Sequence, residues 1–201
     1  MVHVWVRSES RAHEERVGLT PQGAAKLIAA GFKVTVEESA QRILPIADYA
    51  AVGCDVAAEF SWVDAPDDAI IFGLKELPED GTPLRHRHIM FGHAYKGQPA
   101  GQVLLDRFQA GGGTLFDLEY LTEADGKRVA AFGYWAGYAG AAVSLMCWMA
   151  QEKGAIAAPV KAYPSANHML ADLQQDLVAL GTNRPTALII GALGRVGSGA
   201  A

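Results

Sequence analysis

Two titratable side chains, Lys75 and His93, each follow an apolar run that is typical of a buried β-strand. The first run covers residues 70–74 and the second covers residues 88–92. Ligands of parallel α/β sheets bind outside the carboxyl ends of the strands, so two neighbouring strands would bring both side chains into one cleft. A lysine beside a histidine can act as an acid/base pair when burial and like charge depress the lysine pKa. The alternative interpretation is two solvated strand ends without a catalytic role.

The residues that precede this pair predict a parallel α/β sheet. Residues 2–6 alternate in polarity and are rich in β-formers, which indicates a first strand. Thr20 and Pro21 are a good helix start, with threonine as N-cap and proline in the first turn, and Gly31 ends that helix. Residues 32–37 are expected to be a second strand. The strand–helix–strand unit implies a parallel sheet with a right-handed crossover.

Hydrophobic periodicity and the positions of glycine and proline predict the other elements. Residues 61–64 (Ser-Trp-Val-Asp) resemble a capping box and predict another short helix. A strong strand is expected over residues 187–190. The remaining predictions are a short helix over residues 48–52, the two strands before Lys75 and His93, a helix over 100–110, a strand over 114–118, an extended stretch over 128–132, a long helix reaching 153 and a helix over 165–180.

Composition places the chain among soluble globular proteins, because 50% of its 201 residues are apolar and 19% are charged. The formal net charge of −5 gives no electrostatic case for binding nucleic acid or an anionic membrane. Cys54 and Cys147 are the only cysteines, which argues against a disulfide framework and fits the reducing cytoplasm. The N-terminal residues lack the charged and apolar regions of a signal peptide. A cytoplasmic protein is therefore expected.

The most apolar stretch, residues 130–150, approaches the length of a membrane span. However, Gly133, Gly137 and Gly140 interrupt it, and charged residues flank it on both sides. We therefore expect a buried helix that packs closely through its small residues, and no membrane association.

A glycine-rich segment, GALGRVG at residues 191–197, directly follows the strand predicted over residues 187–190. It is a variant of the dinucleotide-binding fingerprint, in which Gly194 and Gly197 fit the second and third glycine positions. A plain glycine-rich turn is the alternative. The fingerprint also needs a helix after the turn and an acidic residue about 20 residues later, and the sequence supplies neither. We therefore expect the chain to be the N-terminal part of a longer protein.

Two further histidines, His86 and His88, lie on one face of an extended segment and raise the question of a metal site. No third ligand follows at a familiar spacing, and Arg85 and Arg87 would repel a cation. No metal is therefore expected.

Six ordered blocks give the whole chain a resemblance to the NAD-dependent, lysine-forming saccharopine dehydrogenases. The blocks are ERVGLTP at 15–21, GLKELPE at 73–79, FGHAYKGQ at 91–98, DLEYL at 117–121, GKRVAAFG at 126–133 and LIIGALGRVGSGA at 188–200. The first two are also similar to the wider alanine dehydrogenase and transhydrogenase group. The resemblance implies a Rossmann-like, parallel-sheet substrate domain over residues 1–135, connecting helices over 136–184, and the first strand and glycine-rich turn of an NAD-binding domain over 185–201.

The resemblance also implies roles for individual residues in oxidising saccharopine to lysine and 2-oxoglutarate with NAD. Lys75 would be the base that handles the amine proton, and His93 would be the acid/base group for hydrating the imine and collapsing the carbinolamine. The other implied roles are substrate binding by Arg16, Lys75, Gln98, Arg128 and Phe132, charge tuning by Lys96, Glu119 and Glu76, and cofactor binding by Lys127, Gly191, Gly194, Arg195 and Gly197.

Alternatives remain open at this point. Arg16 could be a solvated loop charge, Lys127 and Arg128 a turn pair, and Glu76 and Glu119 structural residues. The chain could also belong to an amino-acid oxidoreductase similar to alanine dehydrogenase. A third hypothesis is a non-catalytic domain that binds a small-molecule substrate and lacks the cofactor half.

Overall fold

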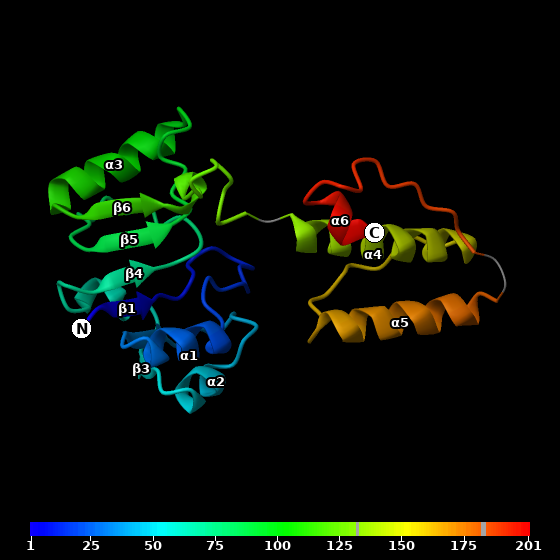
Figure 1. The fold of residues 1–201 in the computed structure, drawn as a ribbon, viewed down its shortest axis with the longest axis horizontal. Coiled ribbons are helices and arrows are strands. Elements are labelled where there is room, and N and C mark those ends of the chain that lie inside the picture. The colour runs from blue at the N-terminus through cyan, green and yellow to red at the C-terminus, as the bar shows by residue number, and fades with distance from the viewer. Residues whose placement is uncertain (132, 182–183) are drawn as a thin grey trace. The chain divides into compact units, whose positions relative to one another are not determined.

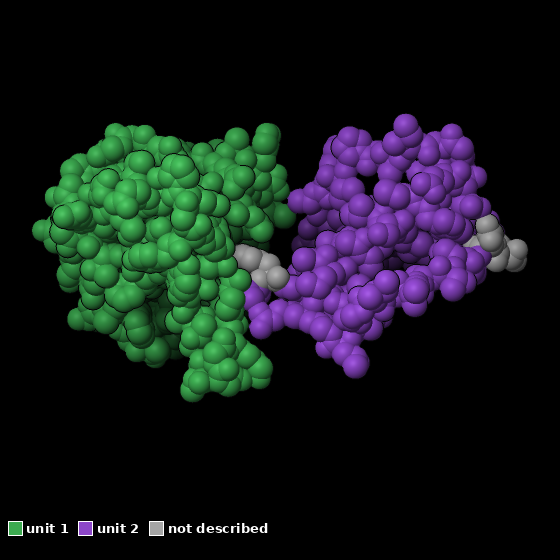
Figure 2. Space-filling model, turned by 90° about the horizontal axis from the view of Figure 1, so that it is seen from above, with its two compact units in different colours: residues 1–130 green, residues 131–201 purple. Residues whose placement is uncertain are grey.

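The computed structural model describes residues 1–131, 133–181 and 184–201. The described chain forms two compact units, residues 1–130 and residues 131–201, which Figure 2 shows in green and purple. The six strands of the described chain all belong to unit 1, whereas the named elements of unit 2 are helices.

One sheet of parallel strands forms the centre of unit 1 (Figure 1). The strands are β1 (His3–Val6), β2 (Lys33–Glu37), β3 (Asp55–Ala57), β4 (Ile70–Phe72), β5 (Arg87–Met90) and β6 (Thr114–Asp117). They lie in the order β3-β2-β1-β4-β5-β6, and every neighbouring pair is parallel, which confirms the predicted α/β class. The strand order reverses between β1 and β4. The carboxyl ends of these two strands therefore mark the topological switch point, where ligands bind in such sheets.

The helices of unit 1 begin and end close to the residues that the sequence indicates. The Thr20 hydroxyl accepts a hydrogen bond from the Gly23 N–H at 3.1 Å, so Thr20 caps the first helix as predicted. Pro21 takes the first helical position, and Gly31 (φ 87°) has the left-handed conformation just beyond the last turn. The α-helices of this unit are α1 (Pro21–Ala29), α2 (Ile46–Ala51) and α3 (Pro99–Gly111).

Alternating side chains of the strands form two hydrophobic cores, one on each face of the sheet. Val4 and Val6 of β1 pack with Ala24 of α1 in one core. Trp5 points to the opposite face, where it is in register with Ile71 of β4 and packs against the core that includes residues of α3. Both faces of the sheet are therefore covered.

The predicted capping box at Ser61 is wrong. A 3₁₀ helix, η1 (Ser61–Asp64), forms there without a side-chain cap, and Phe60 precedes it in a left-handed conformation (φ 60°). The Ser61 hydroxyl donates to the Ala58 carbonyl at 2.6 Å instead, so it is not available as a cap acceptor for the helix.

The segment after β6 also differs from its prediction. It enters a 3₁₀ turn, η2 (Leu118–Tyr120). The sequence predicts an extended stretch over residues 128–132, but Arg128 forms only an isolated antiparallel bridge with Thr122. This pairing closes a local turn and adds no strand to the sheet. Phe132 lies outside the described residues.

Unit 2 contains α4 (Tyr134–Glu152), α5 (Ala166–Ala179) and the short α6 (Gly197–Ala200). The predicted close packing through small residues occurs at Gly137, where an added Cβ would lie 1.8 Å from the Val196 carbonyl oxygen. The prediction of a buried helix is wrong, because Trp135 is 64% exposed and only one side of α4 packs in the core. Of the helices that the structure describes, none combines the length and apolar character that crossing a membrane requires.

The prediction of a strand over residues 187–190 is wrong, because the described structure has no strand there. A strand needs a backbone partner, and all strands of the described chain belong to unit 1. Leu188 and Ile190 are consequently 87% and 90% exposed. The chain then turns at Gly191 (φ 79°), whose carbonyl accepts from the Gly194 N–H at 2.8 Å, and it enters the four-residue α6.

Candidate active site

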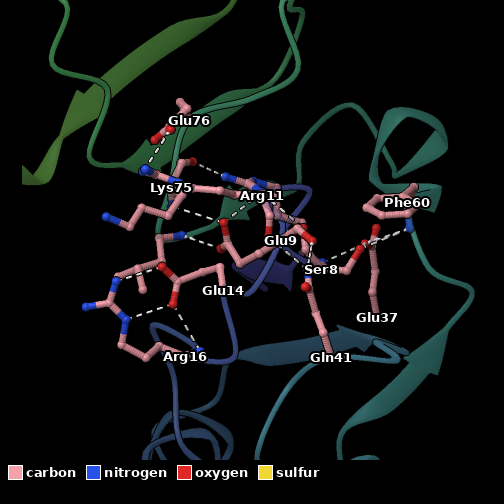
Figure 3. A network of polar contacts seen from close by, with 12 residues as sticks. Ser8, Glu9, Arg11, Glu14, Arg16, Glu37, Gln41, Phe60, Lys75 and Glu76 are labelled. Carbon is pink, nitrogen blue, oxygen red and sulfur yellow. Dashed lines mark hydrogen bonds and ion pairs between the residues drawn. The ribbon is translucent and has the colours of Figure 1, made fainter. Parts of the chain in front are cut away.

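Lys75 lies just beyond β4 on a turn that is bonded to the residues following β1. Its N–H donates to the Glu9 carboxylate at 3.0 Å, and its carbonyl accepts from the Arg7 guanidinium. Figure 3 shows the Lys75 side chain extending away from these backbone contacts, on the same side as the Arg16 guanidinium. Figure 3 draws no hydrogen bond or ion pair from the Lys75 ammonium to the other residues shown. The side chain is therefore available for proton transfer to a bound molecule.

Arg16 holds the carboxylate of Glu14 in a bidentate contact, with Nε 2.7 Å from Oε1 and Nη2 2.6 Å from Oε2. The hydrogen bond from Arg16 holds the pKa of Glu14 below its ordinary value, and the charge of Lys75 adds to this effect. The same hydrogen bond raises the pKa of Arg16. An internal carboxylate therefore occupies the fork that the resemblance assigns to a substrate carboxylate.

His93 follows β5 in the same way that Lys75 follows β4, and β4 and β5 are neighbours in the sheet. It adopts a left-handed conformation (φ 50°), which is uncommon for a residue other than glycine. Its ring stacks on Phe91 with a centroid distance of 6.3 Å, and its buried Nδ1 has no hydrogen-bond partner among the described residues. Uncommon backbone conformations of this kind cluster at functional sites.

Glu119, in η2, is the centre of a charged cluster that is separate from the Arg16–Glu14 pair. Its carboxylate lies 2.9 Å from Lys96 Nζ, 3.0 Å from Arg128 Nη1 and 3.8 Å from His93 Nδ1. The hydrogen bond from Lys96, followed by the charge of Arg128, holds the pKa of Glu119 below its ordinary value. Two permanent cations share one carboxylate, so the cluster carries excess positive charge that favours an anionic ligand.

A cavity of about 230 Å³ connects part of the predicted set. His93, Gln98 and Glu76 line it together with Arg11, which forms a 3.1 Å ion pair with Glu76. The structure thus brings together His93, Gln98 and Glu76 around this cavity, and it places Lys96 and Arg128 beside His93 through Glu119.

Lys127 belongs neither to the charged cluster around Glu119 nor to the group around Lys75 and Arg16. It is 75% exposed and forms a 2.7 Å ion pair with Asp125 in the turn before Arg128. This geometry fits the turn-pair alternative, and a contact between Lys127 and a cofactor stays a prediction.

The glycine-rich segment of unit 2 turns at Gly191 and leads into α6. An added Cβ on Gly197 would lie 2.0 Å from the Gly191 carbonyl oxygen, so backbone fills the space inside this turn. The Arg195 side chain packs against Gly133, where an added Cβ would lie 2.6 Å from Arg195 Cγ. Cofactor binding by Gly191, Gly194, Arg195 and Gly197 therefore stays a prediction.

His86 and His88 belong to the core of unit 1, not to its surface. A ring nitrogen of His86 lies 3.1 Å from the Ala65 carbonyl oxygen, and the His88 ring packs edge-on against Trp62 and Phe108. Within the described residues, no three or more His, Cys, Asp or Glu side chains are grouped so that they could hold a metal ion.

Two buried residues just beyond β1, Arg7 and Glu9, are missing from the set that the sequence predicts, because residues 7–16 read as a charged loop. Both lie at the switch point of the sheet. The signal that indicates Lys75, a charged residue directly after an apolar strand, applies equally to them and would have found them.

Comparison with known proteins shows the family of the chain. Residues 5–139 match the family described as alanine dehydrogenase/PNT, N-terminal domain. The chain belongs to this family. It is also a homologue of NAD(+)-dependent, L-lysine-forming saccharopine dehydrogenases: it is 46% identical to the one from Yarrowia lipolytica over 205 residues, which cover 99% of this chain and 56% of that enzyme. The corresponding enzyme of Schizosaccharomyces pombe is 43% identical over 209 residues, covering 98% of this chain and 56% of the enzyme.

A more distant relative is the mitochondrial alpha-aminoadipic semialdehyde synthase of Rattus norvegicus, which is 31% identical over 67% of this chain and 14% of its own length. The chain spans about half the length of the saccharopine dehydrogenases it matches. Solved structures with a similar fold include an L-alanine dehydrogenase (TM-score 0.50, 16% identity, covering 75% of this chain and 39% of that chain) and a transhydrogenase from Sinorhizobium meliloti (TM-score 0.53, 18% identity, covering 89% and 62%).

Proposed function

We propose that this chain forms the substrate half of an NAD-dependent dehydrogenase that oxidises saccharopine to lysine and 2-oxoglutarate. The observation that supports it is the placement of Lys75 and His93 beyond neighbouring parallel strands, in a chain similar over its whole length to lysine-forming enzymes. The cytoplasm is the proposed compartment, since Cys54 and Cys147 are both free.

In this proposal Lys75 removes the proton from the secondary amine of saccharopine as that carbon–nitrogen bond is oxidised to an imine. NAD supplies the hydride acceptor when bound. The remaining steps are proton transfers and substrate binding by this chain.

His93 then acts on the water that adds to the imine, and on the carbinolamine that results. It takes the proton of the attacking water, and it assists the collapse that separates lysine from 2-oxoglutarate. The Glu119 carboxylate, 3.8 Å from Nδ1, stabilises the imidazolium form that appears between these two transfers. The same carboxylate is also held by Lys96 and Arg128.

Saccharopine carries three carboxylates, so the site needs cations. Arg128, which is 39% exposed, is the proposed partner of one carboxylate. Arg16, which is 55% exposed, is the proposed partner of another and binds it by its outer edge or by exchange with Glu14. Gln98 lines the cavity next to His93 and would donate to the substrate there.

The test is the Lys75→Met variant in an active protein that includes residues 1–201. We expect turnover of lysine, 2-oxoglutarate and NADH in the unchanged protein and at least a roughly tenfold lower kcat in the variant. Near-normal turnover by the variant would remove Lys75 from the base role. Activity with pyruvate and ammonia in place of lysine and 2-oxoglutarate would identify an alanine dehydrogenase-like enzyme instead. Binding of 2-oxoglutarate without NADH consumption would identify a non-catalytic domain.

A further inference from the structure

The turn that carries Lys75 is bonded through its backbone to a single carboxylate. Glu9 Oε1 accepts from the Leu74 N–H at 2.6 Å, and Glu9 Oε2 accepts from the Lys75 N–H at 3.0 Å (Figure 3). The next polar group of the turn, the Lys75 carbonyl, accepts from the Arg7 guanidinium. Arg7 and Glu9 thus hold both polar backbone groups of Lys75.

The neighbouring strand β5 holds the opposite side of the same turn. The Gly73 N–H donates to the Ile89 carbonyl at 3.0 Å, and the Phe91 N–H donates to the Leu74 carbonyl at 3.2 Å. With β5 on one side and Glu9 on the other, the backbone before Lys75 has little freedom to shift. The direction in which the Lys75 side chain leaves the sheet is consequently determined by these bonds.

Arg7 and Glu9 are themselves a buried ion pair, with Nη1 3.2 Å from Oε2 and side chains only 1% and 5% exposed. Burial lowers the pKa of the Arg7 guanidinium, and the charge of Glu9 opposes this change. Gly73 lies directly against the pair, since an added Cβ there would lie 2.3 Å from Arg7 Nε. A buried ion pair seldom adds stability over apolar side chains, so its presence at the switch point favours a role beyond stability.

We propose that Glu9, held in place by Arg7, is a positioning residue that fixes the turn of Lys75 and thereby aims the lysine at its substrate. This inference rests on the proposed function of Lys75. Glu9 contacts no reacting atom in this scheme and acts only through the backbone of Leu74 and Lys75. A displacement of about 1 Å at a reacting group can lower a rate by roughly 10²-fold, so loss of these bonds should reduce turnover.

The variant that tests the proposal is Glu9→Gln, made in an active protein that includes residues 1–201. Both oxygens of Glu9 accept hydrogen bonds, and glutamine would turn one of them into a donor facing an N–H group. Glu37→Gln is the matched control. Glu37 is also fully buried and accepts backbone bonds from Ser8 at 2.8 Å and Phe60 at 3.0 Å, but it forms no bond to the turn of Lys75.

We expect Glu9→Gln to lower kcat by about tenfold or more and to leave the KM for NADH within about twofold. In a Lys75→Met background, the same substitution should have almost no further effect on kcat, because the residue it acts through is gone. Glu37→Gln should lower the unfolding temperature by about as much as Glu9→Gln does, but it should leave kcat unchanged. If Glu9→Gln does not fold, Glu9→Asp, which keeps the charge but cannot reach both N–H groups, should show the same loss of kcat.

Amide hydrogen exchange gives a readout that does not depend on activity. The Leu74 and Lys75 amides should exchange slowly in the unchanged protein and at least about tenfold faster in the Glu9 variants. Equal kcat losses in the Glu9 and Glu37 variants, or a full Glu9 effect in the Lys75→Met background, would overturn the proposal. If the unchanged protein turns over no lysine and 2-oxoglutarate, the proposed function fails. Independently of activity, unaltered exchange of the Leu74 and Lys75 amides in the Glu9 variants would refute the positioning role.

Discussion

His88 should make the stability of unit 1 depend on pH. Its ring is 1% exposed between Trp62 and Phe108, and neither ring nitrogen has a hydrogen-bond partner among the described residues. Burial lowers the pKa of His88 to about 3, and repulsion by Arg7, His86 and Arg107 acts in the same direction. The folded state therefore keeps this imidazole neutral at a pH where an exposed histidine is charged.

The sign and size of the effect follow from the two pKa values. The unfolded chain binds a proton at about pH 6.5, whereas the folded chain binds it only near pH 3. Stability from this group is complete above pH 6.5 and is lost as the pH falls from 6.5 towards 3. The loss is about 2 kcal/mol at pH 5 and approaches about 5 kcal/mol near pH 3, which is comparable with the whole stability of a marginal domain.

The measurement is urea unfolding at several values between pH 4 and pH 7, with the His88→Phe variant beside the unchanged protein. Phenylalanine preserves an aromatic ring between Trp62 and Phe108 but cannot bind a proton, so the free energy of unfolding should fall less steeply with acid. The control is His168→Gln, since His168 is exposed on α5 and its substitution should leave the slope unchanged. Identical slopes in the unchanged protein and the His88→Phe variant would refute the reasoning, whatever the absolute stabilities.

Two further predictions concern the site and the helical unit. Replacing Arg128 by Ala should raise the KM for saccharopine by about tenfold or more and change kcat less, because a substrate carboxylate loses a cationic donor. Steady-state kinetics measures both constants. An unchanged KM would leave Arg128 with only its structural contact to Glu119. Gly137→Ala should lower the free energy of unfolding by about 1–3 kcal/mol, because its Cβ would meet the Val196 carbonyl, whereas Gly140→Ala has no atom within 4 Å and should be neutral or stabilising by up to about 1 kcal/mol. Thermal unfolding compares the two, and equal effects would contradict the close packing.

Local signals along the chain predict most of unit 1. Thr20 and Gly31 mark the ends of α1 because helix capping depends only on backbone groups nearby in the chain. Apolar runs predict β4 and β5, and their parallel pairing follows from the strand–helix–strand opening. The charged ends of those strands indicate Lys75 and His93 as candidate residues from the order of residue types alone.

Signals of this kind fail where the outcome depends on a distant partner. The segment over residues 187–190 has strand-like composition, but composition cannot supply the neighbouring strand whose hydrogen bonds define one. Ser61 has the spacing of a capping box, yet its hydroxyl bonds to the Ala58 carbonyl. Both errors arise because a local pattern states what a segment can do and not which partner it meets.

The sequence by itself determined the α/β class, the parallel sheet and the two strand ends that carry Lys75 and His93, because these depend on periodicity and on residues adjacent in the chain. Only the tertiary structure decided that β1 and β4 meet at the switch point, that Glu14 occupies the fork of Arg16, and that Glu9 binds the backbone of Lys75 from 66 residues away. Hydrogen bonds across such separations depend on which strands lie side by side. That order follows from packing both faces of the sheet, which no stretch of sequence shows alone.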